Sequence, residues 1–161
     1  MTRAGLLLVL LILPATALAQ FSGLPPNVQA AIKENEQTCD KSPKFQPKFI
    51  TERDINGDGV RDYILDYGEF ECDGSATYFC GTGGCLTQVF ASLPNGGYVK
   101  ALDENVRDIK FRQIGKRSVI VLDLHGSACG KVGAAPCPRV LAWDGKTFKR
   151  ATLVPGMTTR K

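Results

Sequence analysis

The segment from Asp54 to Asp62, DINGDGVRD, carries the residues with the clearest chemistry in this sequence. A hard cation such as Ca²⁺ is bound by six or more oxygens from carboxylates, amides, main-chain carbonyls and water. Here oxygen-bearing side chains recur at alternate positions, and glycines at 57 and 59 let the chain curl. The candidate ligands are Asp54, Asn56, Asp58, the carbonyl of Val60, and Asp62. The alternative is a plain polar hairpin turn, since Asn-Gly and Asp-Gly are strong turn formers.

The residues after this segment exclude a helical EF-hand. An EF-hand loop has a glutamate at its twelfth position and a helix beyond it, whereas this chain has Leu65 within the strand-like run DYILDY. The segment DINGDGVRDYIL (54–65) instead resembles the FG-GAP/VCBS calcium loop, found on the blades of integrin-α propellers. The resemblance implies the five ligands above and one structural calcium ion. With only three carboxylates, we expect weak affinity, about 10⁻⁴–10⁻³ M.

The only candidate for acid–base catalysis is His125, the single histidine. Asp123 lies two residues earlier on an expected strand, so both side chains should share a face, and Ser127 follows. Residues this close in sequence rarely form a catalytic triad, and no nucleophile elbow, P-loop or dinucleotide fingerprint is present. We therefore expect no enzyme, and a hydrolase using His125 and Asp123 is the weaker hypothesis.

The segment HGSACGKVGAAPC (125–137) is also a candidate partner-binding loop. Its residues of interest are His125, Gly126, Ser127, Gly130 and Lys131. A loop stiffened by a disulfide would suit insertion into the cleft of another protein.

The N-terminus, MTRAGLLLVLLILPATALAQ, reads as a secretory signal peptide with a cut before Gln20. The apolar run is too short to span a bilayer, which disfavours an uncleaved anchor. After the cut, the formal charge of +4 falls to +3 because Arg3 is removed, which is too small to indicate nucleic-acid binding. The basic residues Lys146, Lys149, Arg150, Arg160 and Lys161 are interpreted as a solvated face. We expect a periplasmic or secreted protein with no membrane span after cleavage.

The expected organisation is a signal peptide (1–19), a helical segment (20–44) and one β domain (45–161). Residues 24–38 begin with two prolines, which suit the first turn of a short helix. After Lys44, alternating apolar residues and the turns NGDG, PNGG and WDGK indicate short strands. The fold class is therefore mainly β, with one short N-terminal helix.

Two parts of the β domain resemble each other. The segment CGTGGCLTQVFASLPNGGYVKA (80–101) aligns with CGKVGAAPCPRVLAWDGKTFKRA (129–151), and YILDY (63–67) with VIVLDL (119–124). We interpret these as two four-stranded antiparallel, blade-like meanders, repeat 1 at about 45–105 and repeat 2 at about 106–154. The alternative is that generic hairpins look alike. Two blades cannot close a propeller, which typically needs four to eight, so the sheets must pack together, extend or associate.

The second repeat has QIGKRS (113–118) where the first has its acidic loop, so one calcium site is expected. All six cysteines follow the predicted cut, and an even count in an exported chain indicates disulfides. Zinc is the competing interpretation, but no CxxC occurs. If the two repeats are equivalent, the pairs are Cys80–Cys85, Cys129–Cys137 and, by remainder, Cys39–Cys72.

Three functions remain open from the sequence. The first is a calcium-stabilised, non-enzymatic binding module that recognises a protein or cell-envelope partner. The second is a loop-insertion inhibitor of a periplasmic or secreted hydrolase such as lysozyme. The third is the hydrolase centred on His125.

Overall fold

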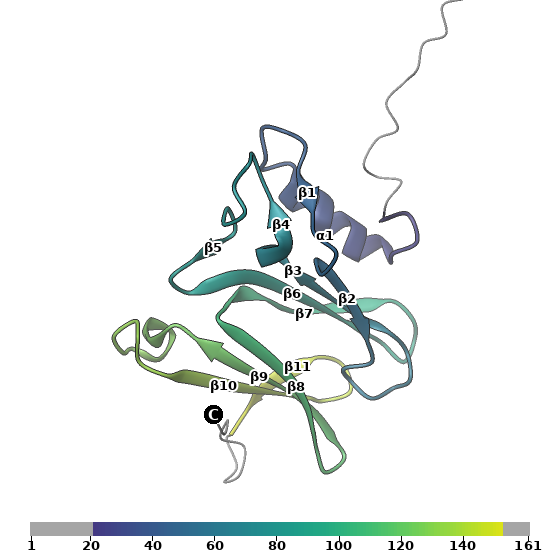
Figure 1. Ribbon diagram of the computed structural model, residues 1–161. Helices are drawn as coiled ribbons and strands as arrows, with labels where there is room; N and C mark the ends of the chain where they lie inside the picture. The colour runs from purple at the N-terminus through teal and green to yellow at the C-terminus, as the bar shows by residue number, and fades with distance from the viewer. Residues whose placement is uncertain (1–20, 153–161) are drawn as a thin grey trace, which may run out of the picture.

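The computed structural model describes residues 21–152, which form a mainly β protein with antiparallel sheets and one α-helix (Figure 1). The predicted signal peptide and residues 153–161 lie outside the described residues. The helix and strands are α1 (Pro26–Glu36), β1 (Lys44–Phe45), β2 (Ile50–Arg53), β3 (Asp62–Asp66), β4 (Phe70–Glu71), β5 (Cys80–Gly81), β6 (Gly84–Ser92), β7 (Tyr98–Val106), β8 (Asp108–Ile114), β9 (Arg117–Leu124), β10 (Cys137–Trp143) and β11 (Phe148–Ala151). Two short 3-10 helices, η2 (Tyr67–Glu69) and η3 (Gly126–Cys129), interrupt the β region.

The strands form two main sheets. In the first, β2 pairs with β3, β3 with β6, and β6 with both β5 and β7. The second has the order β11-β10-β9-β8, so each strand pairs with its neighbour in the chain. A separate pair, β1 and β4, lies beside η2.

The two sheets pack against each other across the larger hydrophobic core. Because side chains alternate along a strand, Val89 and Ala91 of β6 enter this core while Phe90 faces the opposite side. From the second sheet, β9 contributes Ile120 and Leu122. Strand β6 is buried on both faces from 87 to 92, which places it at the centre of the molecule.

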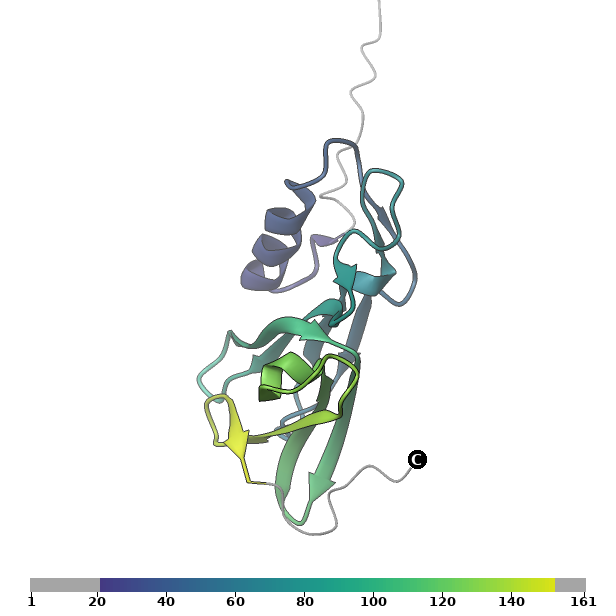
Figure 2. The ribbon, with the colours of Figure 1, turned by 90° about the vertical axis from the view of Figure 1, so that its left-hand side faces the viewer.

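Helix α1 covers the other face of the first sheet (Figures 1 and 2). It begins at Pro26, where a missing N–H costs no helical hydrogen bond, and buries Val28, Ala31 and Ile32. These pack on an aromatic cluster that includes Phe21, Phe45, Phe49, Tyr67, Phe70 and Phe79. The short predicted helix is thus confirmed.

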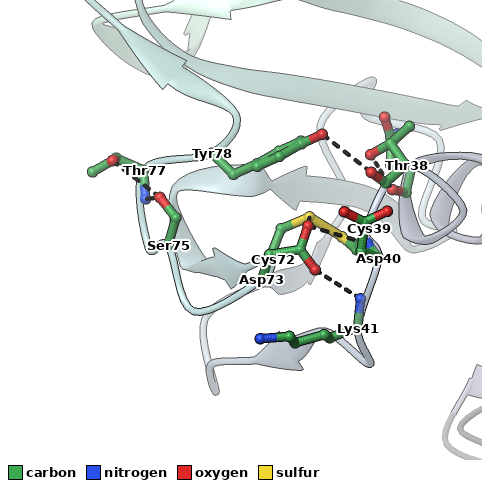
Figure 3. Close-up of a disulfide and its surroundings, with 10 residues drawn as sticks. Thr38, Cys39, Asp40, Lys41, Cys72, Asp73, Ser75, Thr77 and Tyr78 are labelled. Carbon is green, nitrogen blue, oxygen red and sulfur yellow. Dashed lines mark hydrogen bonds between the residues drawn. A yellow bond between two sulfur atoms is a disulfide. The ribbon is translucent and has the colours of Figure 1, made fainter.

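Three disulfides join the predicted pairs of cysteines. Cys39–Cys72 ties the chain after α1 to the end of β4, while Cys80–Cys85 and Cys129–Cys137 close short loops. Figure 3 shows the first of these beside Asp73, whose carboxylate accepts hydrogen bonds from the backbone N–H groups of Asp40 and Lys41. No free cysteine occurs among residues 21–152, a pattern typical of proteins in oxidising, extracytoplasmic compartments.

Candidate functional site

The acidic loop between β2 and β3 is held by hydrogen bonds from its own backbone. The Asp54 carboxylate accepts from the N–H groups of Gly57 and Gly59, at 2.6 and 2.9 Å. Both glycines have positive φ, 85° and 83°, a conformation that other residues rarely adopt. The Asp58 carboxylate accepts from the Val60 N–H at 2.8 Å. The carboxylates therefore shape the turn as well as offering oxygen atoms.

Asp62 is fully buried and closes the loop against β6. Its Oδ2 accepts from the N–H groups of Ile55 and Asn56, at 2.7 and 3.2 Å. Its Oδ1 accepts from the N–H and the hydroxyl of Ser92, both at 2.7 Å. Three backbone N–H groups donate to this carboxylate and the Ser92 hydroxyl lies within reach as a fourth donor, so both oxygens of a buried side chain are hydrogen-bonded.

Ser92, the last residue of β6, lies between two carboxylates. Its Oγ is 2.7 Å from both Asp58 Oδ2 and Asp62 Oδ1, and the Asn56 amide donates to it at 3.2 Å. A hydroxyl has one hydrogen, so it cannot donate fully to both carboxylates. Although burial acts to raise it, the pKa of Asp58 lies below its ordinary value, because Ser92, Val60 and Asn56 donate hydrogen bonds to the carboxylate. The cluster therefore has excess negative charge around a single hydroxyl.

The loop also lies where the two sheets meet. Ile55 is buried in the core between the sheets. A Cβ added to Gly57 would lie 3.2 Å from Ser118 Oγ and 3.3 Å from Gln113 Nε2. Both partners belong to the β8–β9 hairpin of the second sheet, where Gln113 donates to Ser118 at 2.6 Å. The loop is thus hydrogen-bonded to β6 in one sheet and approaches this hairpin of the other closely at Gly57.

The loop has the oxygen atoms that a calcium ion needs, but its carboxylates do not come together around one point. Among residues 21–152, no three His, Cys, Asp or Glu side chains are grouped so as to hold a metal ion. Asp54, Asp58 and Asp62 therefore do not form such a group. Asn56 directs its amide nitrogen to the Ser92 carbonyl, at 2.9 Å, and its Oδ1 accepts from the Asp58 N–H. Oxygens of Asp54, Asp58 and Asn56 keep free lone pairs, so these donors fit a hard cation better than Asp62 does.

His125 follows β9. Catalysis by its imidazole would need a nucleophile on one ring nitrogen and an orienting carboxylate on the other, and only the nucleophile is in place. Its Nδ1 is 2.7 Å from the hydroxyl of Ser127, so a base and a nucleophile are within reach. The Asp123 side chain is exposed and forms no hydrogen bond with His125 in the described part of the chain. On the other side of the ring, a Cβ added to Gly133 would lie 2.3 Å from Nε2. The imidazole therefore packs on the 129–137 loop without an orienting carboxylate.

The two disulfide-closed loops lie side by side. Arg107, between β7 and β8, donates from Nε to the Thr82 carbonyl and from Nη2 to the Gly133 carbonyl, at 3.2 and 2.7 Å. The Gly126 N–H also donates to Gly133, at 3.1 Å. Of the predicted partner-binding residues, Ser127, Gly130 and Lys131 are exposed, His125 is half-buried and Gly126 is buried.

Sequence reasoning missed Ser92 and Arg107. Ser92 lies 36 residues from Asn56, at the end of an apolar strand where a serine carries no local pattern. Arg107 is a single residue between two strands, and only the folded topology brings it to both loops.

Comparisons with known proteins do not place this chain in a family. No family model matches it, and comparison with curated proteins and with solved structures also finds no match. Within residues 21–152, no helix has the length and apolar character to cross a membrane. The calcium, repeat and partner-binding assignments accordingly remain proposals.

Proposed function

We propose that this chain is an exported, calcium-stabilised β protein that acts as a non-enzymatic binding module in the periplasm or outside the cell. The observation that carries the proposal is the position of the acidic loop, which is hydrogen-bonded to Ser92 in one sheet and lies close to the β8–β9 hairpin of the other. A cation bound there would fix the loop at the junction of the sheets. The disulfides support the compartment, and the missing carboxylate at His125 supports a non-enzymatic role.

We further propose that the domain arose from two blade-like meanders of the FG-GAP/VCBS type. Each of the two sheets contains four strands that pair antiparallel in chain order, β2-β3-β6-β7 and β8-β9-β10-β11. In each, a disulfide-closed loop precedes the third strand. The insertion of η2, β4 and β5 into the first copy accounts for its greater length.

The calcium ligands in this proposal are Asp54, Asn56, Asp58 and the carbonyl of Val60, with Asp62 as the fifth predicted ligand. Calcium would supply positive charge to a cluster whose single hydroxyl cannot satisfy both neighbouring carboxylates. Because Asp62 already accepts four hydrogen bonds, its first role is to hold the loop in place.

Calcium should raise the melting temperature of the mature protein. With a dissociation constant of about 10⁻⁴–10⁻³ M, 10 mM calcium stabilises the folded state by about 1.4–2.7 kcal/mol, or roughly 5–10 °C. Asp58→Ala should abolish the rise, while Asp40→Ala, an exposed carboxylate outside the loop, should retain it. Differential scanning calorimetry in EDTA and in calcium measures both. Superimposable native melts in the two buffers would exclude the calcium site.

A loop-insertion inhibitor of a secreted hydrolase is the second candidate function. The observation that favours it is the rigid pair of disulfide-closed loops joined by Arg107. Val132 is 77% exposed at the end of one loop, and Lys131 beside it is also exposed. An apolar side chain on a stiff projection suits a concave site in another protein, because little conformational entropy is lost on binding.

Under this second candidate, the protein should inhibit lysozyme in a cell-wall lysis assay. Val132→Asp should weaken inhibition by about tenfold or more, since a charge would be buried in the contact. Val60→Asp, an exposed valine in the acidic loop, is the matched control and should inhibit as the native protein does. Lysozyme activity that is unchanged in a large molar excess of protein, with no hydrolase captured from a periplasmic extract, would rule this candidate out.

A further inference from the structure

The disulfide Cys80–Cys85 lies in a different setting from the other two. Cys80 of β5 and Cys85 of β6 are directly opposite each other in the first sheet, so the bond closes a small ring across residues 81–84. Three of these four residues are glycines. Strand β5 has only two residues and pairs with β6 alone. The bond therefore belongs to a short hairpin at the edge of the sheet.

This disulfide is also the most accessible of the three. Cys80 and Cys85 are both half-buried, whereas each of the other disulfides contains one fully buried cysteine, Cys72 or Cys137. Cys85 lines a cleft of about 300 Å³ between η2, β6 and the start of β8. Gly68 lies next to its sulfur, where an added Cβ would be 3.1 Å from Sγ, so the missing side chain leaves the sulfur open to the cleft. Thiol–disulfide exchange requires such access for the attacking thiolate.

The contacts around the hairpin allow the bond to open without unfolding of the domain. Phe79, just before β5, is held by ring contacts with Tyr67 and Phe70, at 5.1 and 5.2 Å. Its carbonyl also accepts a hydrogen bond from the Leu86 N–H at 2.9 Å. The two thiols of the opened bond would thus stay close together, and the short chain between them makes the ring easy to close again. Local and reversible opening suits a disulfide that takes part in redox exchange.

The charges in the cleft determine which thiols can approach Cys85. The charged residues of the lining are Asp66, Glu69, Arg107 and Asp108. Asp108 is paired with Lys110 at 2.7 Å, which leaves two carboxylates against one guanidinium group. The cleft therefore has a net negative charge, which repels anionic thiols and admits neutral or cationic ones.

We propose that Cys80–Cys85 is a redox-active disulfide that exchanges with a neutral or cationic dithiol, while the other two disulfides are structural. A thiolate of the dithiol attacks Sγ of Cys85 and forms a mixed disulfide, while the bond to Cys80 breaks and Cys80 leaves as a thiolate that takes up a proton. The second thiol of the reagent then loses its proton, attacks the reagent's own sulfur in the mixed disulfide and releases Cys85, which is protonated in turn. Two electrons and two protons thus pass from the dithiol to the protein. This exchange does not depend on calcium.

Limited reduction of the native protein tests the proposal. The protein is incubated with dithiothreitol, a neutral dithiol, at neutral pH without denaturant, and free thiols are blocked with N-ethylmaleimide and located by peptide mass spectrometry. We expect Cys80 and Cys85 to be labelled at least about tenfold faster than the other four cysteines, with the circular dichroism unchanged. Cys129–Cys137 is the control within the chain, because its sequence separation of 8 is also short but Cys137 is fully buried.

Two small monothiols of opposite charge test the selectivity of the cleft. At low ionic strength, cysteamine, a cation, should open Cys80–Cys85 at least about threefold faster per thiolate than 2-mercaptoethanesulfonate, an anion. Glu69→Gln removes one carboxylate from the cleft and should reduce this difference. The matched control is Glu34→Gln, the same substitution at an exposed position of α1 outside the cleft, which should leave the difference unchanged.

Three results would count against the proposal. Labelling of Cys129 and Cys137 as fast as Cys80 and Cys85 would show that the cleft gives no selective reactivity. Labelling that appears only with loss of the native circular dichroism would show that the bond opens by global unfolding. Equal rates for the two monothiols would overturn the preference for neutral and cationic thiols.

Discussion

Replacing Asp62 with asparagine should destabilise the protein by about 3–5 kcal/mol, with or without calcium. The carboxylate is fully buried and accepts four hydrogen bonds. Asparagine keeps the shape but turns an N–H₂ group toward two donors, either those of Ile55 and Asn56 or those of Ser92. Buried N–H groups then lose their acceptor, which costs the full penalty of desolvation. For a domain that is stable by only 5–15 kcal/mol, this loss is large.

The measurement is the melting temperature in EDTA, where we expect a fall of about 10 °C or more. Asp54→Asn makes the same chemical change in the same loop at an exposed position, and should cost no more than about 1–2 kcal/mol in EDTA. The pair separates the structural role of the loop from ion binding. An Asp62→Asn variant that melts within two or three degrees of the native protein would contradict the role assigned to this carboxylate.

Removing the Cys39–Cys72 disulfide should be the second largest single loss, about 3–4 kcal/mol. The bond closes a loop with a sequence separation of 33, and a cross-link of that span restricts the unfolded chain strongly. It also anchors the chain after α1 to the aromatic cluster, since Cys72 is fully buried. Hydrogen bonds from Asp40 and Lys41 to Asp73, and from the Tyr78 hydroxyl to the Thr38 carbonyl, cross the same junction.

The matched control is the double variant Cys80→Ser with Cys85→Ser, whose disulfide has a sequence separation of only 5. Chain entropy predicts a loss smaller by about 1.5 kcal/mol than in Cys39→Ser with Cys72→Ser. Urea unfolding of both double variants tests the order. If the Cys80/Cys85 double variant loses more unfolding free energy than the Cys39/Cys72 double variant, the order is determined by local packing around Cys85 and not by chain entropy.

Two kinds of feature could be predicted from the sequence: those that depend on a local pattern of residues, and those that depend on the resemblance between the two parts of the β domain. The two prolines before Val28 located the helix, and the alternation at Tyr63 and Leu65 indicated the strand β3. The paired Cys-Gly segments reduced fifteen possible pairings to the one in the structure.

The remainder depends on contacts between distant residues. The aromatic cluster brings together rings from Phe21 to Phe79, and no spacing along the chain indicates which of them will meet. Ser92 contacts the acidic loop only because β6 ends beside it. For the candidate site, the sequence could therefore predict the residue types of the loop, but not that backbone amides and one hydroxyl already occupy much of its acceptor capacity.

The placement of the disulfides has a consequence for how the chain responds to proteases. Each disulfide closes a covalent ring, and two of these rings, which enclose residues 40–71 and 130–136, contain exposed stretches at 57–61 and 130–132. A single cut within either ring opens it without separating the two pieces. The nicked molecule keeps its mass apart from one added water, and its fragments part only on reduction. Damage at the projecting loop that carries Val132 would therefore leave the two sheets covalently connected.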